Sequence, residues 1–165
     1  MADVVDPATR SRMMAGIRGR NTSPELVLRR KLHMAGLRYR LHGSKLPGRP
    51  DIVLAGRRIA VFVHGCFWHR HRGCHWCSTP SSNIDFWSRK FERNIARDRQ
   101  VVETLLADGW RVAVVWECGL RPAHVDRTTD ALLAWVRDPM PASLLESDLV
   151  RRRDSIIGGP DTRRN

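Results

Sequence analysis

The fold is constrained most by two apolar, β-rich runs, residues 51–54 and 58–64, which an Ala-Gly turn joins. Runs of this length and composition predict neighbouring strands connected by a hairpin or a bulged turn. Apolar residues then recur at helical spacing over residues 84–108, and Gly109 is a typical helix terminator. Residues 110–116 return to a strand pattern. A long helix between strands predicts a sheet with helices packed on it.

Weaker signals complete this architecture. A first helix is predicted with Thr22 or Ser23 as its N-cap, Pro24 in its first turn and Gly36 as its stop. Alternating apolar and polar residues at 37–41 predict a half-buried strand, and an amphipathic stretch around 132–136 predicts a last helix. The order helix, three strands, helix, strand predicts an α/β fold with a mixed sheet, flanked by helices, whose ligand edge lies near strand ends.

A chain of 165 residues is long enough for one hydrophobic core and too short to suggest two. We expect one globular domain over residues 21–138. Residues 1–20 are polar and basic and predict an arm, which either grips a partner or frays. Residues 139–165 are polar and arginine-rich, and we expect a mobile basic tail.

The formal net charge of +12 predicts a positive field that attracts polyanions, nucleic acid above all. Only Lys31, Lys45 and Lys90 are lysines, so the charge also fits an arginine bias of the genome. Four cysteines are too few for a disulfide scaffold, and the chain begins without an apolar signal segment. The apolar run 59–68 is far shorter than the roughly 20 residues of a membrane span. These features predict a reduced, cytoplasmic protein.

One carboxylate and two histidines suggest phosphodiester chemistry. Asp51 follows Pro50 at the head of a strand, where a hard cation such as Mg²⁺ finds an oxygen ligand, although Pro-Asp also begins many ordinary turns. His64 and His69 follow the next strand, and imidazoles exchange protons near neutral pH. Hydrolysis of a phosphodiester needs a base for water, a cation for the charge on phosphorus, and an acid for the leaving oxygen.

A zinc site is indicated by soft ligands in one short loop. A local set would use Cys66 or His71 with Cys74 and Cys77, whereas a second set replaces Cys77 with Cys118, at the end of a later strand. Zinc accepts either set, and sequence distance is no barrier to the second. The residues alone leave both open.

Asp98 is an unexpected carboxylate on the apolar stripe of the long helix. It lies three residues after Ile95 and four before Val102, so it should face the sheet, where a carboxylate is costly unless it is paired. A His69-Asp98 dyad would hold the imidazole in one tautomer. An ion pair with a neighbouring arginine, 97 or 99, is the plainer alternative.

Aromatic residues adjoin these polar groups. Phe67 and Trp68 lie in the histidine-rich segment, and Trp87 lies at the start of the long helix. Aromatic side chains usually belong to the core, but on a strongly basic protein they can be wedges that enter a base stack.

Together these segments resemble the very short patch repair endonucleases, a branch of the restriction-endonuclease-like fold. The similarity extends from about Met1 to Leu120 and is strongest in five stretches, residues 8–11, 46–51, 62–69, 94–99 and 109–118. The resemblance implies an enzyme that recognises thymine mispaired with guanine, left by deamination of 5-methylcytosine. Such an enzyme nicks the strand on the 5′ side of that thymine.

The resemblance also implies residue roles. Asp51 and the backbone carbonyl of Val63 would bind Mg²⁺, and valine supplies that carbonyl as well as the threonine of some relatives does. His69 would be the general base, oriented by Asp98, while His64 assists at the phosphate and Glu25 completes the site through water. The zinc set implied is Cys66, His71, Cys74 and Cys118, and the residues implied to contact DNA are Phe67, Trp68, Trp87, Arg10, Arg49 and Lys90.

Two other functions remain open at this stage. The first is a nickase of the same fold with broader mismatch or sequence specificity. The second is a zinc-dependent DNA-binding module without catalysis, which gives no reason to gather two histidines and two carboxylates. The partner expected is double-stranded DNA with a T:G mismatch, bound by a monomer, with mismatch-repair proteins as further candidates.

Overall fold

The computed structural model describes residues 19–139 and 142–147. The predicted arm, with Arg10, and most of the predicted tail lie outside the described residues. The described elements, in chain order, are α2 (Ser23–Met34), β1 (Arg40–Leu41), β2 (Ile52–Leu54), the 3-10 turn η1 (Ala55–Arg57), β3 (Ile59–His64), α3 (Ile84–Ala107), β4 (Arg111–Trp116), the 3-10 turn η2 (Glu117–Leu120), α4 (Val125–Arg137) and β5 (Leu144–Glu146).

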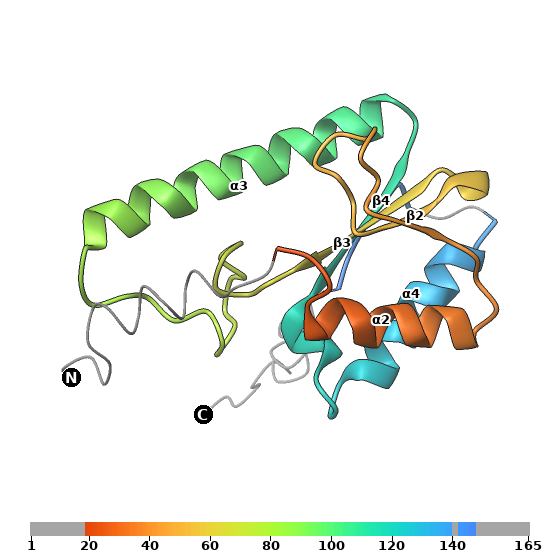
Figure 1. Ribbon diagram of the computed structural model, residues 1–165, viewed down its shortest axis with the longest axis horizontal. Helices are drawn as coiled ribbons and strands as arrows, with labels where there is room; N and C mark the ends of the chain where they lie inside the picture. The colour runs from red at the N-terminus through yellow and green to blue at the C-terminus, as the bar shows by residue number, and fades with distance from the viewer. Residues whose placement is uncertain (1–18, 140–141, 148–165) are drawn as a thin grey trace, which may run out of the picture.

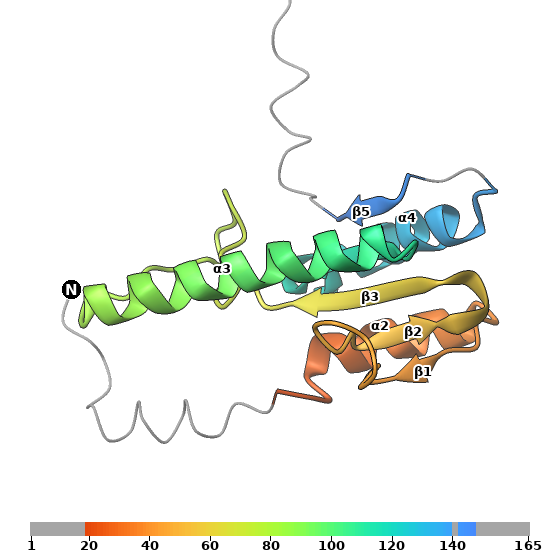
Figure 2. The same ribbon diagram turned by 90° about the horizontal axis from the view of Figure 1, so that it is seen from above.

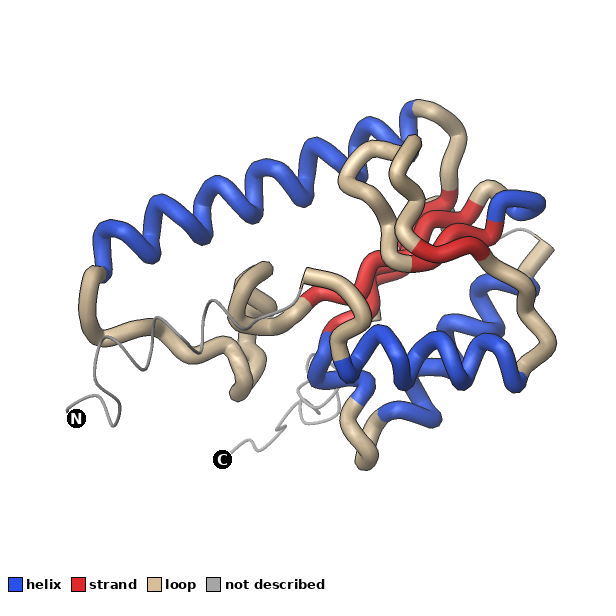
Figure 3. The backbone as a smooth tube through the Cα atoms, viewed as in Figure 1, coloured by secondary structure: helices blue, strands red, loops and turns tan. Residues whose placement is uncertain are grey.

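The strands, red in Figure 3, form one mixed sheet. Their order is β1-β2-β3-β4-β5. The pairs β1/β2 and β2/β3 are antiparallel, whereas β3/β4 and β4/β5 are parallel. The predicted α/β architecture is therefore confirmed.

Helices cover both faces of this sheet. Figures 1 and 2 show α3 along one face and α2 with α4 on the other. Side chains of β3 alternate accordingly: Ile59 and Val61 pack in the core with α2 and α4, while Ala60 and Phe62 pack in the core with α3. The hydrophobic alternation thus fixes which face of β3 each helix covers.

The first half of α3 extends beyond the sheet (Figure 1). Phe91 and Leu105 are its only buried residues, while Ile84 and Phe86 are exposed. The loop between β3 and α3 packs beside this half, because the Phe67 ring meets the Phe91 ring and Asn94 Nδ2 donates to the Trp68 carbonyl at 3.0 Å. α3 therefore joins the sheet to the loop that carries the histidines.

The predicted hairpin or bulged turn between β2 and β3 is confirmed, because the two strands are antiparallel neighbours; a single 3-10 turn closed by Arg58 in the left-handed region, with φ of 51°, links them. Two details differ from the sequence predictions. The strand predicted at 37–41 is only Arg40–Leu41. The stretch expected to be mobile contributes β5, whose three residues are too few for a periodic signal. Within the described ranges, no helix is long and apolar enough to cross a membrane.

Candidate active site and metal centre

Asp51 sits just before β2 and is anchored to the neighbouring strand. Its Oδ2 accepts a hydrogen bond of 2.8 Å from the Val63 N–H. The pKa of this carboxyl is raised to about 6, mainly by burial; the Val63 hydrogen bond opposes the shift, and the nearby negative charge of Glu25 contributes to it. A divalent cation would offset the cost of keeping this carboxylate charged in a partly dry site.

The Val63 carbonyl points toward β2, the side on which Asp51 lies. The N–H and C=O of one strand residue point to the same side, so this carbonyl points toward β2, as the N–H does. Extending the register Ile52↔Val61 puts Pro50 opposite Val63. Because proline has no N–H, Pro50 cannot donate a hydrogen bond to the Val63 carbonyl. The Asp51 carboxylate and this carbonyl are hard oxygen donors of the kind that Mg²⁺ prefers, so the residues fit the cation.

Glu25 is buried in the first turn of α2. It forms a capping box with Thr22, and its Oε2 accepts hydrogen bonds from Asn21 N–H at 2.9 Å and Arg29 Nη2 at 2.6 Å. Ligand atoms of Glu25, Asp51 and His42 all lie within 4.8 Å of one another. Sequence analysis named the two carboxylates but missed His42.

The second group consists of His69, His64 and Asp98. Asp98 comes from α3, and its Oδ2 is 2.5 Å from His69 Nδ1, so the predicted contact is present. Both side chains are 21% exposed, which leaves the imidazole open to a ligand. The carboxylate fixes the proton on Nδ1 and leaves Nε2 as the basic nitrogen. The catalytic role of this dyad stays a prediction.

His64 stacks on His69, with ring centroids 3.9 Å apart and planes 9° apart. The pKa of His64 is lowered to about 3, mainly by burial and in smaller part by the neighbouring His69. His64 is therefore neutral at physiological pH. Of the two stacked rings, His69 is the one that contacts the Asp98 carboxylate.

The third group gathers Cys66, His71, Cys74 and Cys118, all buried, with ligand atoms within 4.8 Å of one another. His71 Nδ1 lies 3.6 Å from Cys66 Sγ and 3.4 Å from Cys118 Sγ. Tetrahedral zinc with ordinary bond lengths separates nitrogen and sulfur ligands by about 3.5 Å, so the spacing fits zinc. Cys77 is not a member, and this Cys₃His set is the one that the resemblance implied.

The pKa values of the thiols show why a cation suits this group. The thiol of Cys118 raises the pKa of Cys66 to about 12, with burial as the second cause, and burial also raises the pKa of Cys74. Zinc binds thiolates, and its charge reverses such shifts. Trp116 stacks on the His71 ring, with ring centroids 4.2 Å apart. The set ties the loop to the end of β4.

The aromatic side chains form a partly exposed cluster beside the histidines. Phe67 contacts Trp68 at 5.1 Å and Trp87 at 5.5 Å between ring centroids, both edge to face. The ammonium of Lys90 lies 5.1 Å from the Trp68 ring and 5.3 Å from the Trp87 ring. Of the other residues predicted to contact DNA, Arg49 is exposed in the loop before β2.

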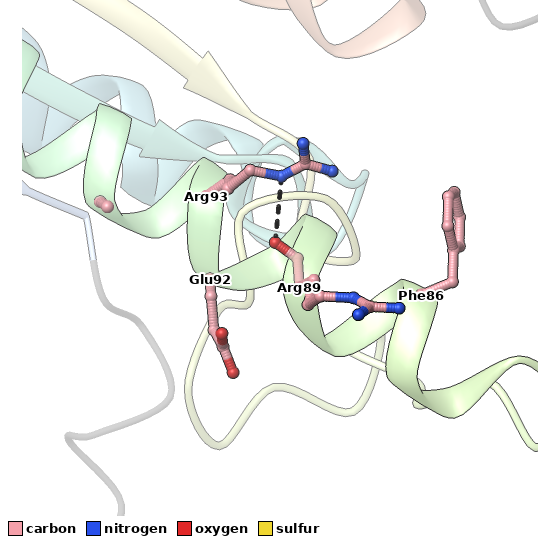
Figure 4. A pocket seen from close by; sticks show the side chains of 5 residues that line it. Phe86, Arg89, Glu92 and Arg93 are labelled. Carbon is pink, nitrogen blue, oxygen red and sulfur yellow. Dashed lines mark hydrogen bonds between the residues drawn. The ribbon is translucent and has the colours of Figure 1, made fainter.

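A shallow hollow of about 550 Å³ lies on α3, away from these ligand groups (Figure 4). Its lining is Phe86, Arg89, Glu92, Arg93 and Ala96, and Arg93 Nε donates to the Arg89 carbonyl at 3.3 Å. The hollow has no histidine or cysteine. It offers basic surface rather than catalytic groups.

Comparison with known proteins shows the family of this chain. The family model of DNA mismatch endonuclease Vsr matches residues 2–76. The DNA mismatch endonuclease Vsr of Escherichia coli K12 is 42% identical over 139 residues, which cover 82% of this chain and 88% of that protein. This chain belongs to the Vsr DNA mismatch endonuclease family.

Other Vsr relatives have different names. The Type II nicking enzyme V.XorIIP of Xanthomonas oryzae pv. oryzae is 51% identical over 120 residues, 73% of this chain and 88% of that protein. The Type II nicking enzyme V.NmeAIP of Neisseria meningitidis is 40% identical over 127 residues, 77% of this chain and 90% of that protein. The present Vsr protein is accordingly a DNA nicking endonuclease, a hydrolase of phosphodiester bonds.

The matched range of the Vsr model includes Asp51 and His69 but ends before Asp98 and Cys118. Those two residues reach their groups through the fold, from α3 and from the end of β4. The candidate ligand and histidine groups are therefore assembled from both halves of the chain.

Proposed function

We propose that this endonuclease nicks double-stranded DNA at a T:G mismatch, on the 5′ side of the thymine. The observation that carries the proposal is the His69-Asp98 contact, with His64 stacked beside it and Asp51 hydrogen-bonded to the neighbouring Val63. A DNA-binding module without catalysis has no use for an oriented base. The enzyme would act as a monomer in the bacterial cytoplasm.

In the proposed reaction, His69 takes a proton from the attacking water through Nε2. Asp98 orients the ring and stabilises the imidazolium that forms. Neutral His64 donates a hydrogen bond to the scissile phosphate. Asp51 and the Val63 carbonyl would hold Mg²⁺. Its positive charge would stabilise the negative charge that develops on the phosphoryl oxygens during the attack.

Mismatch choice is assigned to the cluster of Phe67, Trp68 and Trp87. Inserting aromatic side chains costs a few kcal/mol of base unstacking, and a weakly paired T:G step opens more easily than a Watson–Crick pair. The Lys90 ammonium lies over the rings of Trp68 and Trp87. There it would contact the DNA phosphates that flank the inserted rings. Arg10 and Arg49 would contribute phosphate contacts that are independent of sequence.

A nickase with another trigger is the second candidate, favoured by the printed names of the Xanthomonas and Neisseria relatives. The two candidates separate when duplexes of one flanking sequence are digested in parallel. The panel contains a T:G pair, the other mismatches, and the fully paired site. Nicking at least tenfold faster at T:G supports our proposal, whereas equal cleavage of paired DNA supports the second candidate.

Trp68→Ala is expected to weaken binding to T:G DNA by roughly 10-fold or more and binding to paired DNA much less, because a stacked aromatic contributes about 1–3 kcal/mol per base. Fluorescence anisotropy on both duplexes measures this difference. Arg10→Ala is the matched control, and it should weaken both affinities alike and reduce their salt dependence. Equal losses for Trp68→Ala would assign Trp68 to the core.

A further inference from the structure

We propose that His42 is a nitrogen ligand of the divalent cation at Asp51, which makes the site a mixed imidazole and carboxylate centre. The inference rests on the proposed cation site at Asp51. It assigns to the site a residue that the sequence motifs did not indicate.

Strand register puts His42 beside Asp51. The β1/β2 pairs Arg40↔Val53 and Leu41↔Ile52 extend by one step to His42 and Asp51, and the His42 N–H donates to the Asp51 carbonyl at 3.1 Å. This backbone hydrogen bond keeps the two residues side by side just beyond the last pair of the β1/β2 ladder.

The distances within the group suit one ion. The ligand atoms of His42, Asp51 and Glu25 lie within 4.8 Å of one another. Octahedral ligands with bonds near 2.1 Å are about 3 Å apart when adjacent and about 4.2 Å apart when opposite. A small contraction brings this group to that geometry.

The three residues are not equally available to a cation. Both carboxylate oxygens of Glu25 accept hydrogen bonds, from Thr22 on one side and from Asn21 and Arg29 on the other. In the described part of the chain, by contrast, no hydrogen bond engages the His42 ring. His42 and Asp51 are thus the direct ligands, and Glu25 is an outer carboxylate that reaches the ion through water.

The His42 backbone is held in an uncommon conformation that presents the ring to the group. Its φ is 50°, in the left-handed region, and the following Gly43 N–H donates to the Pro50 carbonyl at 2.9 Å. Non-glycine residues in this region cluster at functional sites, where the surrounding hydrogen bonds maintain the strain. The turn fixes His42 against the residues that precede β2.

A nitrogen ligand changes which cations the site prefers. Carboxylates and carbonyls suit Mg²⁺ and Mn²⁺ alike, whereas imidazole favours transition metals over Mg²⁺. We therefore infer that Mn²⁺ binds more tightly than Mg²⁺, and that His42 contributes much of the difference.

Mn²⁺ is the probe that tests this directly. Zinc-loaded protein is titrated with Mn²⁺, and electron paramagnetic resonance gives the bound fraction while electron spin echo modulation detects a coordinated imidazole nitrogen. His42→Asn is the test variant, because asparagine tolerates a positive φ. We expect it to lose the nitrogen modulation and to bind Mn²⁺ on the order of 10–100-fold more weakly.

Control variants make each outcome decisive. His33→Ala, an exposed histidine of α2, and His69→Ala should both retain the nitrogen modulation. Modulation that persists in His42→Asn, or Mn²⁺ affinity unchanged there, overturns the role of His42. Asp51→Asn tests the underlying site separately: unchanged Mn²⁺ binding in that variant, or no binding in the wild type, would overturn the cation site itself. Bound zinc and the melting temperature report folding in every variant.

Discussion

Replacing His69 with alanine is expected to lower the nicking rate by roughly 10²–10⁴-fold, the usual contribution of a general base. DNA affinity should change little, because the ring is 21% exposed and contributes no charge contact to a phosphate in our account. Single-turnover nicking of T:G DNA measures the rate, and anisotropy measures the affinity. Asp98→Asn should have the same effect in milder form, since it leaves the base present but poorly oriented.

The control for this variant is His124→Ala, an exposed histidine before α4. It should nick like the wild type. A His69→Ala rate within tenfold of the wild type would contradict the assigned base, and an equal loss of binding and rate would indicate a role in holding DNA instead.

Replacing Cys118 with serine is expected to release zinc and to lower the free energy of unfolding by about 4 kcal/mol or more, because loss of a metal is among the largest single-substitution effects. In this set Cys118 is the ligand that joins the loop to the end of β4, so its loss leaves three ligands and removes the metal link between the loop and the sheet. Metal analysis after mild chelation and denaturant unfolding measure the two effects.

Cys77→Ser is the matched variant, because Cys77 lies in the same loop but outside the Cys₃His group. It should keep one zinc ion per chain and nearly wild-type stability. If Cys77→Ser lost the zinc while Cys118→Ser kept it, the local ligand set would be correct and the structure of the loop would be wrong.

The sequence predicted elements best where one physical signal was strong. The first helix carries a capping residue and Pro24, and the observed helix begins at Ser23 with Thr22 as its cap. The long helix was predicted from its apolar spacing, which also exposed Asp98 as a misplaced carboxylate. The prediction that Asp98 pairs with His69 came from this one irregularity, and the structure shows the contact.

Long-range placement was harder to predict. Nothing in the spacing of the cysteines separated Cys77 from Cys118, because only the path of β4 brings Cys118 to the loop. His42 was missed for a similar reason: its link to Asp51 comes from the β1/β2 register across the turn-rich loop 43–50. The strand β5 is short and half exposed, so its pairing with β4 leaves no pattern.

The central claim is a cation-dependent nick beside a mispaired thymine. The most direct measurement uses a T:G duplex labelled on both strands, incubated with zinc-loaded protein in Mg²⁺ or in buffer without divalent cations. Our account predicts one cut, in the thymine strand on the 5′ side of the thymine, that appears only with Mg²⁺. Cleavage of equal rate without divalent cations, or cuts in both strands, would contradict it.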